Sequence, residues 1–142
     1  MAHINIGKTY RFLNGYLNAL DHCTKAIKIG DKYWPSTHFF IAQAYQTLGS
    51  VYYDRQIYFA TLENFQNVLR IYLRNLPMDK TYLAMLYNDI SAVYCDIKDY
   101  KNSLKNINRA IEIFHQIFDS DQFEECVGTA QGLATLLVFD WS

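Results

Sequence analysis

The segment DISAVY, residues 89–94, has two close counterparts earlier in the chain, TLGSVY at 47–52 and NIGKTY at 5–10. Successive segments are 42 residues apart. Aligning the sequence with itself at this shift superimposes three sets of identical residues, which are Tyr10/Tyr52/Tyr94, Tyr16/Tyr58/Tyr100 and Leu20/Leu62/Leu104. A fixed period of this length predicts a chain built from repeated structural units.

Apolar residues within each repeat have the spacing of amphipathic helices. Tyr45, Leu48 and Tyr52 follow one another in steps of three and four, which places them on one helix face. Turn-forming pairs and the two prolines, Pro35 and Pro77, separate such segments. The sequence therefore predicts seven helices, at 2–13, 16–30, 37–54, 58–75, 79–97, 100–117 and 121–139.

Repetition of helix pairs also predicts how the chain buries its apolar surface. One pair cannot cover its own apolar face, whereas stacked pairs bury a continuous core between neighbours. Gly7 and Gly49 share a repeat position with Ser91, so this position stays small. We expect this small residue to let the paired helices approach closely, in an all-α solenoid of about three helix pairs.

The composition excludes several classes of partner. The 142 residues contain 13 Lys and Arg against 14 Asp and Glu, so no basic excess favours nucleic acid. No apolar run approaches the 18 or so residues of a membrane span, and we expect no membrane contact.

Cys23, Cys95 and Cys126 are odd in number and widely spaced, unlike a disulfide framework or a zinc site. A reducing, cytoplasmic location is expected.

Motifs of catalysis or cofactor binding do not occur in the sequence. There is no Gly-rich phosphate loop, no Gly-X-Ser-X-Gly elbow and no His-Glu-X-X-His. His3 shares a repeat position with Tyr45 and Tyr87, so we expect it to pack between helices. The other histidines, His22, His38 and His115, lack the ligand spacing of a metal site. We predict no enzymatic activity, no cofactor and no metal.

The order of residues within the repeat resembles that of the tetratricopeptide repeat (TPR). A small residue is followed by Tyr three and nine positions later, Leu thirteen later and Ala or Val nineteen later, most clearly in LRNLPMDKTYLAMLYNDISAVYCDIKDYKNSLKNINRAIEIF, residues 73–114. The 42-residue period is longer than the usual TPR period of about 34 and resembles that of kinesin light chains. The resemblance implies a right-handed α-solenoid and a single array over 1–142, with repeats at about 1–35, 36–77 and 78–119.

Two parts of the chain depart from this pattern. The resemblance implies an alanine at the repeat position of Ala19. The second and third repeats have Thr61 and Ser103 there, so we expect looser packing of the paired helices in these two repeats. Residues 120–142 are expected to form a capping helix, with a partial fourth repeat as the alternative. A further alternative is end-to-end self-association, in which Leu136, Val138 and Phe139 meet Ile4 and Ile6 of another copy.

In TPR arrays the first helix of each pair lines a concave groove. The resemblance implies the same role for the predicted helices at 2–13, 37–54 and 79–97. The candidate peptide contacts are Lys8, Arg11, Phe12, Gln46, Ser50, Tyr53, Asp54, Asn88, Cys95 and Asp96. Met1, Ile4, Gln43, Met85 and Ala92 complete the pattern.

This mixture of charge, amide and aromatic groups suits an extended or helical peptide. The cations by which chaperone-binding TPR proteins hold a terminal carboxylate are replaced by Gln46, Gln43 and Met85, so a chaperone tail is not expected. The expected function is that of a protein–protein interaction scaffold that binds a peptide segment of a partner. The alternative is a regulatory or targeting TPR fragment of a larger multidomain enzyme or motor-adaptor protein.

Overall fold

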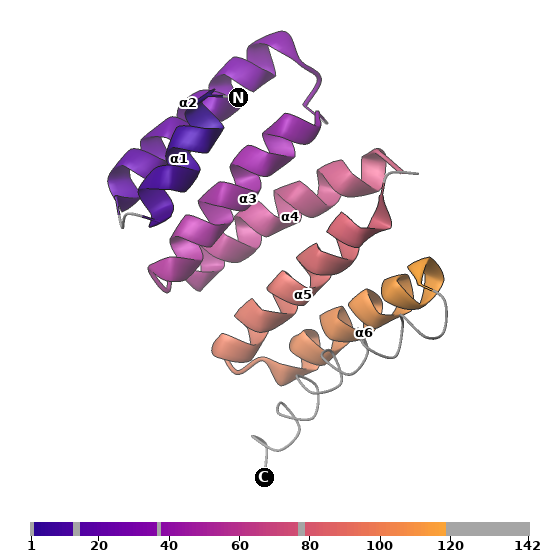
Figure 1. Cartoon of the computed structure of the whole chain (residues 1–142). Helices are drawn as coiled ribbons and strands as arrows, with labels where there is room; N and C mark the ends of the chain where they lie inside the picture. Colours follow the sequence, from indigo (N-terminus) through magenta and orange to yellow (C-terminus); the bar gives the residue numbers. More distant parts are fainter. Residues whose placement is uncertain (1, 13–14, 37, 77–78, 119–142) are drawn as a thin grey trace. The chain divides into compact units, whose positions relative to one another are not determined.

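A computed structural model describes residues 2–12, 15–36, 38–76 and 79–118 (Figure 1). It confirms the all-α fold, because the regular elements of these residues are six helices and no strand. They are α1 (Ala2–Phe12), α2 (Tyr16–Tyr33), α3 (Phe39–Asp54), α4 (Tyr58–Arg74), α5 (Lys80–Asp96) and α6 (Tyr100–Ile117). The helix predicted over 121–139, and with it the cap, lies outside the described residues.

The helices pair in chain order, as in a helical repeat. The chain divides into two compact units, Met1–Leu76 and Pro77–Ser142. In the first unit α1 packs on α2, α2 on α3 and α3 on α4, and in the second unit α5 packs on α6. No helix in the described part of the chain has both the length and the apolar character that a bilayer span requires.

The predicted helix boundaries are confirmed to within a few residues, with one instructive exception. We predicted that α2 ends at Gly30, but it continues to Tyr33 and ends just before Pro35. A Cβ atom on Gly30 would lie 2.8 Å from Cγ1 of Ile41, so this glycine permits a close contact between α2 and α3. Proline ends the helix, because the residue before it is disfavoured in the helical conformation.

Helices α3 and α5 end in the same way, one repeat apart. The residues that follow them, Gln56 and Lys98, have φ angles of 61° and 62°. Ile57 N then donates to Tyr52 O, and Asp99 N to Tyr94 O, both at 2.9 Å. This is the Schellman arrangement, in which the left-handed residue is usually glycine. The sequence predicted both breaks. It did not predict the left-handed conformation, because neither Gln56 nor Lys98 is a glycine.

The small repeat position lies at a helix–helix contact, as predicted. A Cβ atom on Gly7 would lie 2.7 Å from Sγ of Cys23, and one on Gly49 would lie 2.5 Å from Cε1 of Phe65. Thr61 and Ser103, where looser packing was expected, are both fully buried. The Thr61 hydroxyl donates to Ile57 O at 3.1 Å, so its polar atom is satisfied.

Ser91 and Ser103 join α5 to α6 through reciprocal hydrogen bonds. The Ser91 hydroxyl donates to Ser103 O at 3.0 Å, the Ser103 hydroxyl donates to Ser91 O at 2.9 Å, and the two Oγ atoms are 2.9 Å apart. Both side chains are buried, at 1% and 0% exposure. Hydroxyl groups at these two positions therefore replace apolar contact by a closed polar pair.

Alanine substitutions should reveal this pair as a coupled one. We expect Ser91→Ala and Ser103→Ala each to lower the free energy of unfolding by about 1 kcal/mol. The double variant should lose less than the sum, because it leaves neither hydroxyl without its partner. Urea unfolding of the four proteins measures this coupling, and strict additivity would contradict it. Thr9→Ala is the control, since among the described residues this surface hydroxyl bonds only to Asn5 O in its own helix.

Candidate functional site

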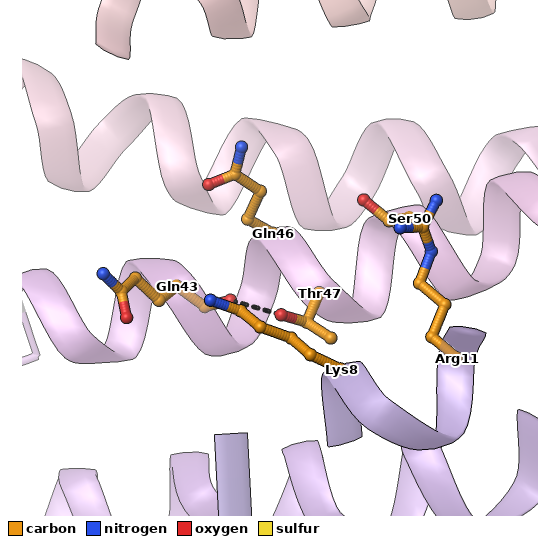
Figure 2. Close-up of a pocket in the computed structure, with 6 residues that line it drawn as sticks. All are labelled: Lys8, Arg11, Gln43, Gln46, Thr47 and Ser50. Atoms are coloured by element: carbon orange, nitrogen blue, oxygen red, sulfur yellow. Dashed lines mark hydrogen bonds between the residues drawn. The ribbon is translucent and has the colours of Figure 1, made fainter. Parts of the chain in front are cut away.

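Five of the predicted groove residues, Lys8, Arg11, Gln43, Gln46 and Ser50, line one pocket in the first unit. Lys8 and Arg11 come from α1, whereas Gln46 and Ser50 come from α3 (Figure 2). Gln43 and Thr47 complete the lining of this cavity of about 290 Å³. We refer to these six residues as the Lys8 pocket.

Helix periodicity explains why these side chains converge. Gln43, Gln46, Thr47 and Ser50 are three or four residues apart, so they share one face of α3. Lys8 and Arg11 are likewise three apart on α1, which packs against α3. The TPR pattern omitted Thr47, although its spacing from Gln43 was a visible signal. Its hydroxyl donates to Gln43 O at 2.9 Å.

An ion pair holds α1 to α3 at one edge of the pocket. Arg11 Nε donates to Asp54 Oδ2 at 2.8 Å and Arg11 Nη2 donates to Asp54 Oδ1 at 3.2 Å. The two side chains are 30% and 29% exposed, and the bidentate geometry fixes the guanidinium plane. Asp54 neutralises Arg11, whereas Lys8 makes no ion pair with any described residue. The positive charge left in the pocket is therefore that of Lys8.

Amide and hydroxyl groups of α3 add uncharged donors and acceptors. Gln46 Oε1 accepts a long hydrogen bond of 3.4 Å from the Tyr72 hydroxyl. The NH₂ group of Gln46 is left to donate to a ligand. The side chains of Gln43 and Ser50 make no hydrogen bond within the described part of the chain. Besides the guanidinium of Arg11, which is paired with Asp54, the pocket thus presents the ammonium of Lys8, the amides of Gln43 and Gln46 and the hydroxyl of Ser50.

Other predicted contacts lie elsewhere. The ring of Tyr53 meets that of Tyr58 at a centroid distance of 6.0 Å. Ile4 is 3% exposed, so its assignment as a groove and end-surface residue is wrong: α1 packs on both α2 and α3, and Ile4 is part of the core. Ile6, by contrast, is 39% exposed.

Some candidates cannot be assigned to the Lys8 pocket. Met1 and the self-association residues Leu136, Val138 and Phe139 lie outside the described residues, and so does the side chain of Phe12. Asn88, Cys95 and Asp96 are on α5 of the second unit, with Asn88 and Cys95 half-buried and Asp96 exposed. Their role as ligand contacts stays a prediction.

The two histidines of the first helix pair meet although they are far apart in sequence. His3 Nδ1 is 2.9 Å from His22 Nδ1 and the rings stack at 5.1 Å. His3 therefore packs between α1 and α2, as its repeat position predicted. Among the residues described, no group of three or more His, Cys, Asp or Glu is placed to hold a metal.

Cys23 of α2 is a buried free thiol. Burial raises the pKa of Cys23 to about 11, although Lys8 opposes part of this effect. The thiol is therefore protonated at neutral pH and packs as a small apolar side chain against Gly7.

Comparison with known proteins adds no further constraint on this site: no protein-family model matches the chain, and no curated protein matches it either.

Proposed function

We propose that the chain is a TPR-like, cytoplasmic interaction scaffold and that the Lys8 pocket binds a peptide segment of a partner protein. The observation that carries the proposal is the convergence of Lys8, Gln43 and Gln46 on one cavity from two helices. The 42-residue period and the paired helices support the comparison with TPR arrays.

The size and lining of the pocket favour a peptide over a small apolar ligand. Sites for small molecules usually span 300–1,000 Å³ and are mostly apolar. The Lys8 pocket, at about 290 Å³, lies just below this range, and every lining residue is polar or charged. A cavity of this size accommodates one or two residues of an extended chain.

Amide side chains match the groups of a peptide backbone. Each amide both donates and accepts, so Gln43 and the free NH₂ of Gln46 pair with backbone C=O and N–H groups. Lys8 donates to a carbonyl or to an acidic side chain of the peptide. The Arg11–Asp54 ion pair keeps α1 against α3, so the pocket is preorganised before the partner binds.

The test begins with a displayed library of random peptides, selected on the whole chain. For peptides so selected, Gln43→Ala/Gln46→Ala should weaken binding about tenfold or more, because two hydrogen bonds contribute roughly 1–3 kcal/mol. The control is Gln66→Ala, an exposed amide on α4. Fluorescence anisotropy with labelled peptide measures the dissociation constants.

A second pair of variants isolates the charge. Lys8→Ala should weaken binding and reduce its dependence on salt, whereas Lys28→Ala, an exposed lysine on α2, should leave both unchanged. Selected peptides that bind all four variants as tightly as the wild type would exclude the Lys8 pocket. Failure of the library to yield any peptide that saturates the chain would count against the function as a whole.

A further inference from the structure

A second pocket of the first unit lies on the opposite face of α3. Tyr45 lines this pocket, whereas Gln43 and Thr47 line the Lys8 pocket. Tyr45 is two residues from each of them, and two residues correspond to about 200° of rotation around the helix axis. Its polar and charged lining residues are Asp31, Ser36, Tyr45, Asn67, Arg70 and Arg74. We refer to these residues as the Arg70 pocket.

Arg70 and Arg74 give this pocket an excess of positive charge. They are four residues apart near the end of α4, so both project from the same face, and like charges at this spacing repel. Arg70 donates to Asn67 Oδ1, which is uncharged. Asp31 lines the same pocket, yet in the described part of the chain it forms no ion pair with either arginine. Two guanidinium groups against one carboxylate leave the lining with a net positive charge.

Uncharged donors face the same space. Burial raises the pKa of the Tyr45 hydroxyl and Asp31 raises it further, whereas Arg70 lowers it. The hydroxyl is thus protonated at neutral pH and is a donor, as is the hydroxyl of Ser36. Ile41 and Ile71, which are 1% and 4% exposed, form an apolar floor that keeps water from one side of these groups.

We propose that the Arg70 pocket binds an oxyanion, a phosphate or carboxylate group of a ligand, between the guanidinium groups of Arg70 and Arg74. The cavity of about 80 Å³ is several times the 10–15 Å³ or so that one water requires, and it admits a single tetrahedral anion. Guanidinium groups present paired donors whose geometry matches the oxygens of phosphate and carboxylate. A bound anion also relieves the repulsion between the arginines. This site is independent of the proposed function of the Lys8 pocket.

Calorimetric titration of the whole chain at pH 7 and constant ionic strength tests the site, with inorganic phosphate, O-phosphoserine and acetate as separate probes. We expect saturable binding of at least one probe, with a dissociation constant on the order of 1 mM. Arg70→Gln/Arg74→Gln should weaken it about tenfold or more. The matched control, Lys28→Gln/Arg55→Gln, removes the same charge from the first unit and should bind as the wild type does.

The three probes identify the source of the oxyanion. Tighter binding of O-phosphoserine than of inorganic phosphate assigns the site to a phosphorylated side chain, equal binding assigns it to free phosphate, and preference for acetate assigns it to a carboxylate. Absence of saturation by every probe overturns the proposal, and so does equal weakening in the control variant. Lys8→Ala should not change the titration, so the two pockets are tested separately.

Discussion

Gly49→Val is expected to lower the free energy of unfolding by about 3 kcal/mol, because α3 and α4 touch at this residue. A Cβ atom would lie 2.5 Å and 2.6 Å from Cε1 and Cδ1 of Phe65, well inside contact distance. The residue is 4% exposed, so the ring is held within the core. Valine adds two further carbons to this contact, and its small advantage over glycine in helix propensity does not offset them.

Removing the ring of Phe65 tests the same contact more directly. Phe65→Ala alone should cost about 3–5 kcal/mol. In that background Gly49→Ala should stabilise the chain by about 1 kcal/mol, because the ring no longer obstructs the new methyl group and alanine is the better helix former. In the wild type the same substitution should destabilise the chain.

Urea unfolding followed by circular dichroism measures these changes, with Ala92→Val as the control. Ala92 is an exposed residue in the middle of α5, so valine there should cost only roughly 0.6 kcal/mol. If Gly49→Ala has the same sign in both backgrounds, the ring of Phe65 is not what requires a glycine at this position.

The repeat made most of the fold predictable. Positions such as Gly7 and Gly49 recur at a fixed interval, and each recurrence is separate evidence for the same helix pair. The exceptions depend on contacts that no periodic pattern encodes. Gly30 was placed at the end of a predicted helix, whereas its contact with Ile41 is a tertiary feature inside α2. The interlocked hydroxyls of Ser91 and Ser103 are likewise visible only once α5 and α6 are paired.

The candidate site was predictable to a lesser extent. The resemblance to TPR arrays singled out Lys8 and Gln46, and both line the pocket. The charge balance of that pocket did not follow, because Arg11 and Asp54 are 43 residues apart and pair only after α1 packs on α3. The Arg70 pocket was not predicted from the sequence. Its lining residues come mostly from three helices, α2, α3 and α4, and lie away from the face that the TPR pattern indicates.

Asp89→Asn is expected to stabilise the chain by about 2 kcal/mol at pH 7, an unusual gain for a single substitution. Asp89 is a half-buried residue of α5 at the repeat position of Asn5 and Thr47. Burial raises the pKa of its carboxyl from 3.8 to about 6. This difference corresponds to an unfavourable free energy of about 3 kcal/mol in the charged state, and partial exposure lessens it. Asparagine keeps the shape and removes the charge.

The sign of the pH dependence distinguishes this cause from a general effect of charge. Between pH 4 and 6 the folded chain holds a proton on Asp89 that the unfolded chain releases, so this residue makes stability rise as the pH falls through that range. The advantage of asparagine should therefore be full above pH 7 and nearly absent at pH 4. Glu112→Gln, an exposed carboxyl on α6, should change stability by less than about 0.5 kcal/mol at either pH. An advantage of Asp89→Asn that is equal at pH 4 and pH 7 would show that desolvation of the carboxylate is not its origin.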